Sequence, residues 1–238
     1  MFDAGLPKSI FSEVKGRTFI YPSAGCDLEE PFRLFSGHCD ELIFVDINYD
    51  FNCRPSPAFE GWRLVKVDII GSTKERIRII EGERRSYREV SPAWRRQTYR
   101  SETNSREVVV TQRRGFGQYA IRELPDESLG IFFHRGDSGG EGGSGVLYLG
   151  NQTLKHEPIA RVFDTIKTKL SYPALIASDG SNIMFPQIRR AVSDGNFSLN
   201  GFSAGGLRWT QVAKLPWRLG ATVIWKVQPI AAETWQPC

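Results

Sequence analysis

The sequence is poor in the residues that build disulfide-bonded and zinc-stabilised folds. It has only 4 cysteines and 3 histidines among 238 residues, and it contains no CxxC or HxxxH pair. A chain of this length does not need disulfides for stability, so we expect ordinary buried thiols. The alternative is a zinc site made of Cys26, His38, Cys39 and Cys53. The adjacent His38 and Cys39 would have difficulty reaching one ion together, so we predict no metal site.

Long apolar segments are also missing. A membrane-spanning helix needs about 20 consecutive apolar residues, and the sequence has no such run. The first residues contain Asp3, Lys8 and Glu13, and they lack the basic start and continuous apolar stretch of a secretory signal. We therefore predict a cytoplasmic protein with no membrane partner.

Two common catalytic signatures are absent as well. There is no GK[ST] ending of a phosphate-binding P-loop, which argues against that type of ATP or GTP hydrolysis. His38, His134 and His156 show no triad pattern, which argues against a serine hydrolase.

Positive charge is concentrated in the middle of the chain. Residues 61–122 contain 15 basic and 7 acidic residues, a net charge of +8, whereas the rest of the chain carries −4. Arginines such as Arg84, Arg85, Arg95 and Arg96 are interleaved with aromatic residues, and this combination can bind phosphates and stack on bases. We predict that these four arginines bind nucleic acid. The alternative is the solvated face of an antiparallel sheet.

Both ends of the chain have the pattern of a parallel sheet covered by helices. Near the N-terminus, Arg17–Tyr21 and Glu41–Asp46 are β-prone runs, and the segment Asp27–Phe35 between them has helical spacing. The pattern returns after residue 128. There the sequence predicts a strand at Leu129–His134, a helix at Ile159–Leu170, a strand at Ala174–Ala177, a helix at Pro186–Val192 and an antiparallel strand pair within Leu207–Val227.

The segment between these two parts has a different pattern. Short β-prone runs occur at Trp62–Ile70, Arg76–Ile80, Glu107–Gln112 and Gln118–Leu124, and no helical pattern is evident. We therefore predict one α/β domain over residues 1–238, with a mainly parallel sheet, a C-terminal antiparallel hairpin and a basic β-rich insertion at about residues 54–124.

Small and polar residues follow four of the expected strands, where ligands bind in open parallel sheets. In the first loop, Ala24 and Gly25 allow a ligand to approach the backbone, although a single glycine is not a GxGxxG motif. Asp46 follows the second strand and can bind the two hydroxyls of a ribose. The alternative is that Asp46 only caps a turn.

The third loop is unusually rich in glycine, with six glycines between Arg135 and Gly145. Such a loop can wrap a phosphate or fold over a ligand, and Asp137 and Glu141 are candidate bases or hydroxyl-binding groups. The alternative is a flexible connection. In the fourth loop, Asp179 and Asn182 can bind a substrate or cap the following helix.

The organisation resembles the class I, Rossmann-like fold of S-adenosylmethionine-dependent methyltransferases. Phe19–Asp27 is similar to the first strand and cofactor loop of that family, and Phe44–Asp46 to the second strand with its acidic residue. The segment Ala174–Asn182 looks like a late strand, and Leu207–Val227 like the closing antiparallel pair.

The resemblance implies a methyltransferase that uses S-adenosylmethionine on an unknown acceptor, with nucleic acid as one candidate. The residues assigned to the cofactor are Tyr21, Ser23, Ala24, Gly25, Asp27, Asp46 and Asn48. Those assigned to the acceptor are Arg135, Ser138, Glu141, Asp179 and Asn182, with Asp137 as the catalytic residue that orients it.

Two other functions stay open. One is a non-catalytic module that binds a nucleotide or polyanion through the arginine-rich segment. The other is a partner-binding protein that uses tryptophans such as Trp94 and Trp217, although core packing is the commoner use of such residues.

Overall fold

The computed structural model describes residues 6–51, 55–71, 75–81, 84–137, 146, 148–150, 162–181, 185–193, 201–217 and 220–230. For residues 75–81, 84–90, 217 and 220 it describes the backbone alone.

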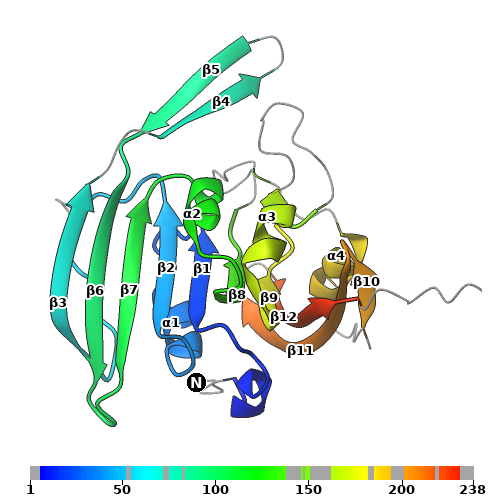
Figure 1. Ribbon diagram of the computed structural model, residues 1–238, viewed down its shortest axis with the longest axis horizontal. Coiled ribbons are helices and arrows are strands. Elements are labelled where there is room, and N and C mark those ends of the chain that lie inside the picture. The colour runs from blue at the N-terminus through cyan, green and yellow to red at the C-terminus, as the bar shows by residue number, and fades with distance from the viewer. Residues whose placement is uncertain are drawn as a thin grey trace, which may run out of the picture.

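The centre of the molecule is a ten-stranded sheet with the order β10-β11-β12-β9-β8-β1-β2-β7-β6-β3 (Figure 1). Its middle five strands run parallel to one another. These are β7 (Glu107–Arg114), β2 (Glu41–Asp46), β1 (Thr18–Pro22), β8 (Leu129–His134) and β9 (Leu170–Ser178). Apolar runs fit this position because parallel strands are covered on both faces, and every residue of β8 is buried.

Antiparallel strands extend the sheet on both sides. On one side lie β6 (Ala93–Ser101) and the edge strand β3 (Trp62–Gly71). On the other side lie β12 (Gly220–Pro229), β11 (Leu207–Trp217) and the short β10 (Phe202–Ala204). Two further strands, β4 (Glu75–Glu81) and β5 (Arg84–Val90), form a separate hairpin that projects beyond the end of the sheet (Figure 1).

Helices cover the two faces unequally. Helix α1 (Glu29–Phe35) packs on one face, where Phe32 and Phe35 join a core with Phe19 and Phe44. Three helices pack on the opposite face: α2 (Gly117–Glu123), α3 (Val162–Lys169) and α4 (Pro186–Ser193). A short 3-10 helix at Lys8–Phe11 packs on the same side as α1. Within the described residues, no helix is both long enough and apolar enough to cross a bilayer.

The predicted fold class, a mainly parallel and helix-covered Rossmann-like α/β fold, is wrong. The large sheet is mixed, and five of its nine strand pairings are antiparallel. The described helices number only four, each of seven or eight residues. The physical reason lies between β2 and β7. Where a doubly wound fold crosses over through a helix, this chain forms strands that extend the sheet.

Individual elements differ from expectation in the same region. The run expected as a strand at Gln118–Leu124 forms helix α2, so the expectation of no helix there is also wrong. The expected segment 54–124 holds β3 to β7, of which β7 belongs to the parallel centre rather than to an appendage. By contrast, β2 and β8 have the expected bounds, and β11 and β12 pair antiparallel as predicted.

Candidate functional site

The loops after the parallel strands lie together at one edge of the sheet. Two backbone-to-carboxylate hydrogen bonds tie them in pairs. The N–H of Gly25, after β1, donates to Oδ2 of Asp46 at 3.0 Å, and the N–H of Gly136, after β8, donates to Oδ2 of Asp179 at 2.7 Å. The described residues of the four predicted loops therefore form a rim at this edge, joined in two pairs by these bonds.

The loop after β1 is a tight turn built on left-handed backbone. Ser23 has a φ of 59° and Gly25 a φ of 54°, and a side chain is rarely found in this conformation. Ala24 is buried, and its N–H donates to the Val45 carbonyl at 2.9 Å, which fixes the loop against β2. A Cβ added to Gly25 would lie 4.0 Å from the Asp46 carboxylate, so this backbone faces the acid directly.

Asp46 organises two turns at once. Its Oδ2 accepts from Gly25, and its Oδ1 accepts the N–H of Asn48 at 2.7 Å. The turn-capping alternative is therefore present in the structure. Each carboxylate oxygen can accept more than one hydrogen bond, and Asp46 is only half-buried, so the carboxylate retains capacity for a ligand hydroxyl. Asn48 itself is exposed.

Three of the predicted site residues bind one another across the rim. The Arg135 guanidinium, which is fully buried, forms a forked pair with Asp27 at 2.6 and 2.8 Å and a second ion pair with Glu30 of α1. The Tyr21 hydroxyl donates to Asp27 and lies 2.9 Å from the Arg135 carbonyl. Burial and the charge of Asp27 raise the pKa of Tyr21 well above its usual range. Tyr21, Asp27 and Arg135 thus hold the rim together.

Asp137, the predicted catalytic residue, lies inside the protein. It is 1% exposed, and its Oδ2 lies 3.1 Å from Nε2 of the buried His134. Asp179 binds the backbone of Gly136 and both the N–H and the hydroxyl of Ser181. Asp179 therefore joins the β8 loop to the β9 loop. The predicted residues Ser138, Glu141 and Asn182 lie outside the described residues.

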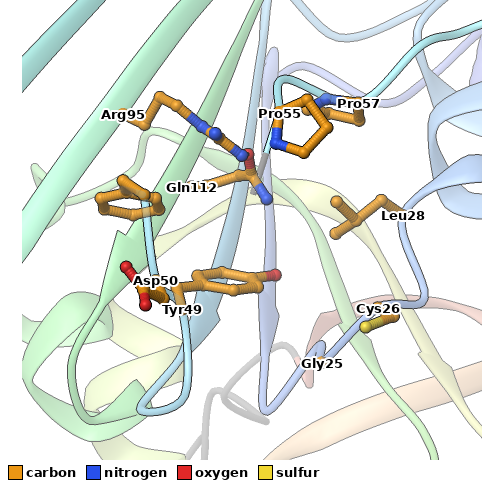
Figure 2. A pocket seen from close by; sticks show the side chains of 10 residues that line it. Gly25, Cys26, Leu28, Tyr49, Asp50, Pro55, Pro57, Arg95 and Gln112 are labelled. Atoms are coloured by element: carbon orange, nitrogen blue, oxygen red, sulfur yellow. The ribbon is translucent and has the colours of Figure 1, made fainter. Parts of the chain in front are cut away.

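Beside this rim the structure has a cavity of about 120 Å³. Figure 2 shows Gly25 and Cys26 at the lower right of it, Tyr49 and Asp50 at the lower left, and Arg95 and Gln112 above Tyr49. The remaining lining residues are Leu28, Phe51, Pro55 and Pro57.

Two polar side chains that line the cavity, Arg95 and Gln112, have fixed orientations. Nε and Nη2 of Arg95 both donate to Oε1 of Gln112, the former at 3.0 Å, so the Gln112 amide nitrogen points away from Arg95 (Figure 2). The Arg95 guanidinium also lies over the Phe51 ring, 5.1 Å from its centroid. Burial lowers the pKa of Arg95. A planar cation, an amide donor and an aromatic ring therefore surround the space.

Tyr49 brings a polar group to the cavity without a hydrogen bond of good geometry. The residue is 4% exposed, and its buried hydroxyl has no hydrogen-bond partner among the described residues. Burial, followed by the negative charge of Asp46, raises the pKa of Tyr49 well above its usual range, and the nearby Gln112 amide offsets this only in part. A buried hydroxyl left unbonded is costly, which is typical of a site that a ligand completes.

The arginines predicted to bind nucleic acid do not form one patch. Arg95 is buried at the cavity, whereas the next residue, Arg96, points to the opposite face of β6, where it is 55% exposed and lies 3.9 Å from Glu41. The alternation of a strand separates such neighbours. Arg84 and Arg85 lie on β5, outside the residues whose side chains the structure describes.

The predicted thiols are partly described. Cys39 is buried, and burial raises the pKa of its thiol, whereas Cys26 is exposed at the cavity mouth. In the described part of the chain, no three His, Cys, Asp or Glu side chains lie close enough to share a metal ion.

Sequence reasoning missed three residues that line the cavity, Tyr49, Phe51 and Gln112. Two signals point to them. Tyr49 and Phe51 are aromatic residues just after a strand-end acid, and Gln112 is a polar residue in an apolar strand.

Comparison of the chain with protein-family models, with curated proteins and with solved structures found no match.

Proposed function

We propose that the protein binds a nucleoside-containing cofactor, S-adenosylmethionine, at the carboxyl edge of the parallel strands. The observation that supports this most is the position of the cavity. It lies between the loops after β1 and β2 and in front of β7, beside the Gly25 backbone and next to the turn that Asp46 organises.

The residues present fit the parts of such a ligand. The cavity has an aromatic and amide lining suited to a flat base, with Tyr49 and Gln112 as hydrogen-bonding groups. Asp46 has remaining acceptor capacity for ribose hydroxyls, and the half-buried Gly25 has no side chain to block the approach of a polar chain end. When bound, the cofactor supplies an activated methyl group. The protein's part is to position it against an acceptor.

A non-catalytic form of this function is favoured by a different observation. Asp137 is buried and bound to His134, and Arg135 is neutralised by Asp27 and Glu30. The groups expected to orient an acceptor are therefore already engaged in the fold. A nucleotide-binding module that performs no methyl transfer has the same cavity and the same ligand.

Calorimetric titration with S-adenosylmethionine and S-adenosylhomocysteine tests the binding. Since the Tyr49 hydroxyl is the unbonded group, Tyr49→Phe should weaken binding by about tenfold, the effect of one lost hydrogen bond of roughly 1.4 kcal/mol. Arg96→Ala, one residue from Arg95 but on the other face of β6, is the control and should leave affinity unchanged.

Turnover separates the two forms. Incubation with isotopically labelled S-adenosylmethionine and a mixture of RNA, DNA and small molecules should transfer label if the protein is a methyltransferase. Binding without transfer supports the non-catalytic module. Absence of binding by both nucleosides at millimolar concentration rejects the proposal.

A further inference from the structure

The edge strand β3 presents an unusual surface. Among the described residues it pairs with β6 alone, so one side of its backbone has no strand neighbour. Five large apolar side chains on this one strand are exposed, and they are Leu64 at 38%, Val65 at 45%, Val67 at 42%, Ile69 at 60% and Ile70 at 55%. A long, apolar open edge is a template for pairing with another strand, and folded proteins usually block it.

Strand β3 carries three charged residues, Arg63, Lys66 and Asp68, and the last two form a pair. Lys66 and Asp68 are two residues apart, on the same face of the strand, and their side chains pair at 2.7 Å. They flank Val67 symmetrically. Beyond them, Leu64 and Val65 precede the charges and Ile69 and Ile70 follow them. The order of apolar and charged residues is therefore nearly the same read in either direction from Val67.

We propose that β3 pairs antiparallel with β3 of a second copy of this chain, about a two-fold axis through Val67. In this register Lys66 of each copy lies opposite Asp68 of the other, which forms a ring of four alternating charges. Val67 of each copy faces Val67 of the other, and Ile69 and Ile70 lie against the segment Leu64–Val65 of the partner copy, where β3 bends. Each of these cross-strand pairs is favourable, and the symmetry makes every pair away from the axis occur twice.

The neighbouring registers are worse for a physical reason. A two-fold axis perpendicular to the sheet joins like faces, so it passes through a residue position. Centring the pairing on Lys66 or on Asp68 places that charge opposite itself, which is repulsive. Centring it on Val65 or Ile69 leaves both charges opposite uncharged residues. Charge complementarity thus selects the axis at Val67.

The same strand limits this pairing to one defined register. The pairing of β3 with β6 shifts register between Leu64 and Lys66, so Val65 is an extra residue that bends the strand. Regular strand continues from Lys66 to Gly71. About the proposed axis, the stretch that is regular in both copies is Lys66, Val67 and Asp68, which holds both charges, while the bend on each side of it discourages sliding to other registers and open-ended association.

Charge reversal tests the register directly. Sedimentation velocity at about 1 to 100 µM protein should show a species of twice the 26.9 kDa chain mass. Lys66→Asp and Asp68→Lys each place like charges opposite one another and should weaken association at least tenfold. The double variant K66D/D68K restores unlike pairs and should recover the dimer. A mixture of the two single variants should form a heterodimer.

Asp126→Lys is the matched control. Asp126 is itself exposed and lies 2.7 Å from Lys169, as short a distance as in the Lys66–Asp68 pair, but it does not lie on β3, so its reversal should leave the dimer intact. Far-UV circular dichroism checks that each variant is folded. A wild-type protein that is monomeric throughout this concentration range overturns the proposal, as does a dimer that the single reversals leave unchanged.

Discussion

Removing one atom from Tyr49 should have opposite effects on stability and on ligand binding. The Tyr49 hydroxyl is buried without a hydrogen-bond partner among the described residues. Such a group costs about 1–3 kcal/mol of desolvation, so Tyr49→Phe should raise the free energy of unfolding by roughly 1–2 kcal/mol. For a chain of 238 residues, at about 2.1 cal/mol/K of unfolding entropy per residue, that gain raises Tm by about 2–4 °C.

Tyr99 provides the matched comparison. It is also a buried tyrosine on the same face of the sheet, but its hydroxyl donates to the Pro57 carbonyl at 2.6 Å and accepts from Gln97 at 3.3 Å. Tyr99→Phe leaves these partners unsatisfied and should lower the free energy of unfolding by about 1–2 kcal/mol. Urea unfolding followed by tryptophan fluorescence measures both variants, with unchanged m-values as the check on two-state behaviour.

The opposite signs decide the reasoning. If Tyr49→Phe destabilises the protein as much as Tyr99→Phe, the hydroxyl is satisfied in the ligand-free protein, and the inference that a ligand completes the site loses its basis. If Tyr49→Phe stabilises the protein but leaves nucleoside affinity unchanged, the hydroxyl faces the cavity without taking part in binding.

Three further predictions concern the rim and the core. Arg135→Ala leaves two carboxylates beside an emptied buried site and should cost about 3 kcal/mol in urea unfolding, whereas Arg100→Ala, which removes an exposed ion pair, should cost under about 1 kcal/mol; similar losses would refute the buried network. His38 is buried, and burial lowers its pKa, so on acidification the unfolded chain takes up this proton at a higher pH than the native protein does. The free energy of unfolding should therefore fall as pH drops below about 6.5. Between pH 7.5 and pH 5.5 the unfolding midpoint should drop less in His38→Gln than in the wild type, and an equal drop would contradict this origin. A Cβ on Gly130 would lie 2.0 Å from a backbone oxygen, so Gly130→Ala should lower Tm sharply, while Gly37→Ala, with open space, should not; equal Tm values would disprove the close approach.

The parallel strands could be predicted because their sequences carry a strong local signal. Glu41–Asp46 and Leu129–His134 are short apolar runs bounded by polar residues, and each forms a strand with those bounds. The loops that follow them could also be placed together, because parallel strands end at the same edge.

The antiparallel extension was harder to predict. Strand β6 places Arg95 and Gln97 on its buried face, so its inward positions do not look apolar, and its sequence shows a charge cluster rather than an alternation. Its burial depends on tertiary partners, Gln112 and Phe51, that the local sequence does not reveal. The cavity could not be predicted for the same reason, because Arg95 and Gln112, which line it, are polar residues at buried positions of strands.

The rim residues illustrate a different limit. Tyr21, Asp27 and Arg135 were chosen because polar residues at strand ends often contact ligands. The structure shows that they contact one another. Residues 108 positions apart form this ion pair, and no local pattern distinguishes a carboxylate that awaits a ligand from one that already has a distant arginine.

Crystals soaked with S-adenosylhomocysteine test the central claim most directly. We predict density for the base in the cavity beside Tyr49 and Gln112, with the ribose beside Asp46. Well-diffracting crystals that bind the nucleoside elsewhere, or that leave this cavity empty at millimolar ligand, would contradict the assignment.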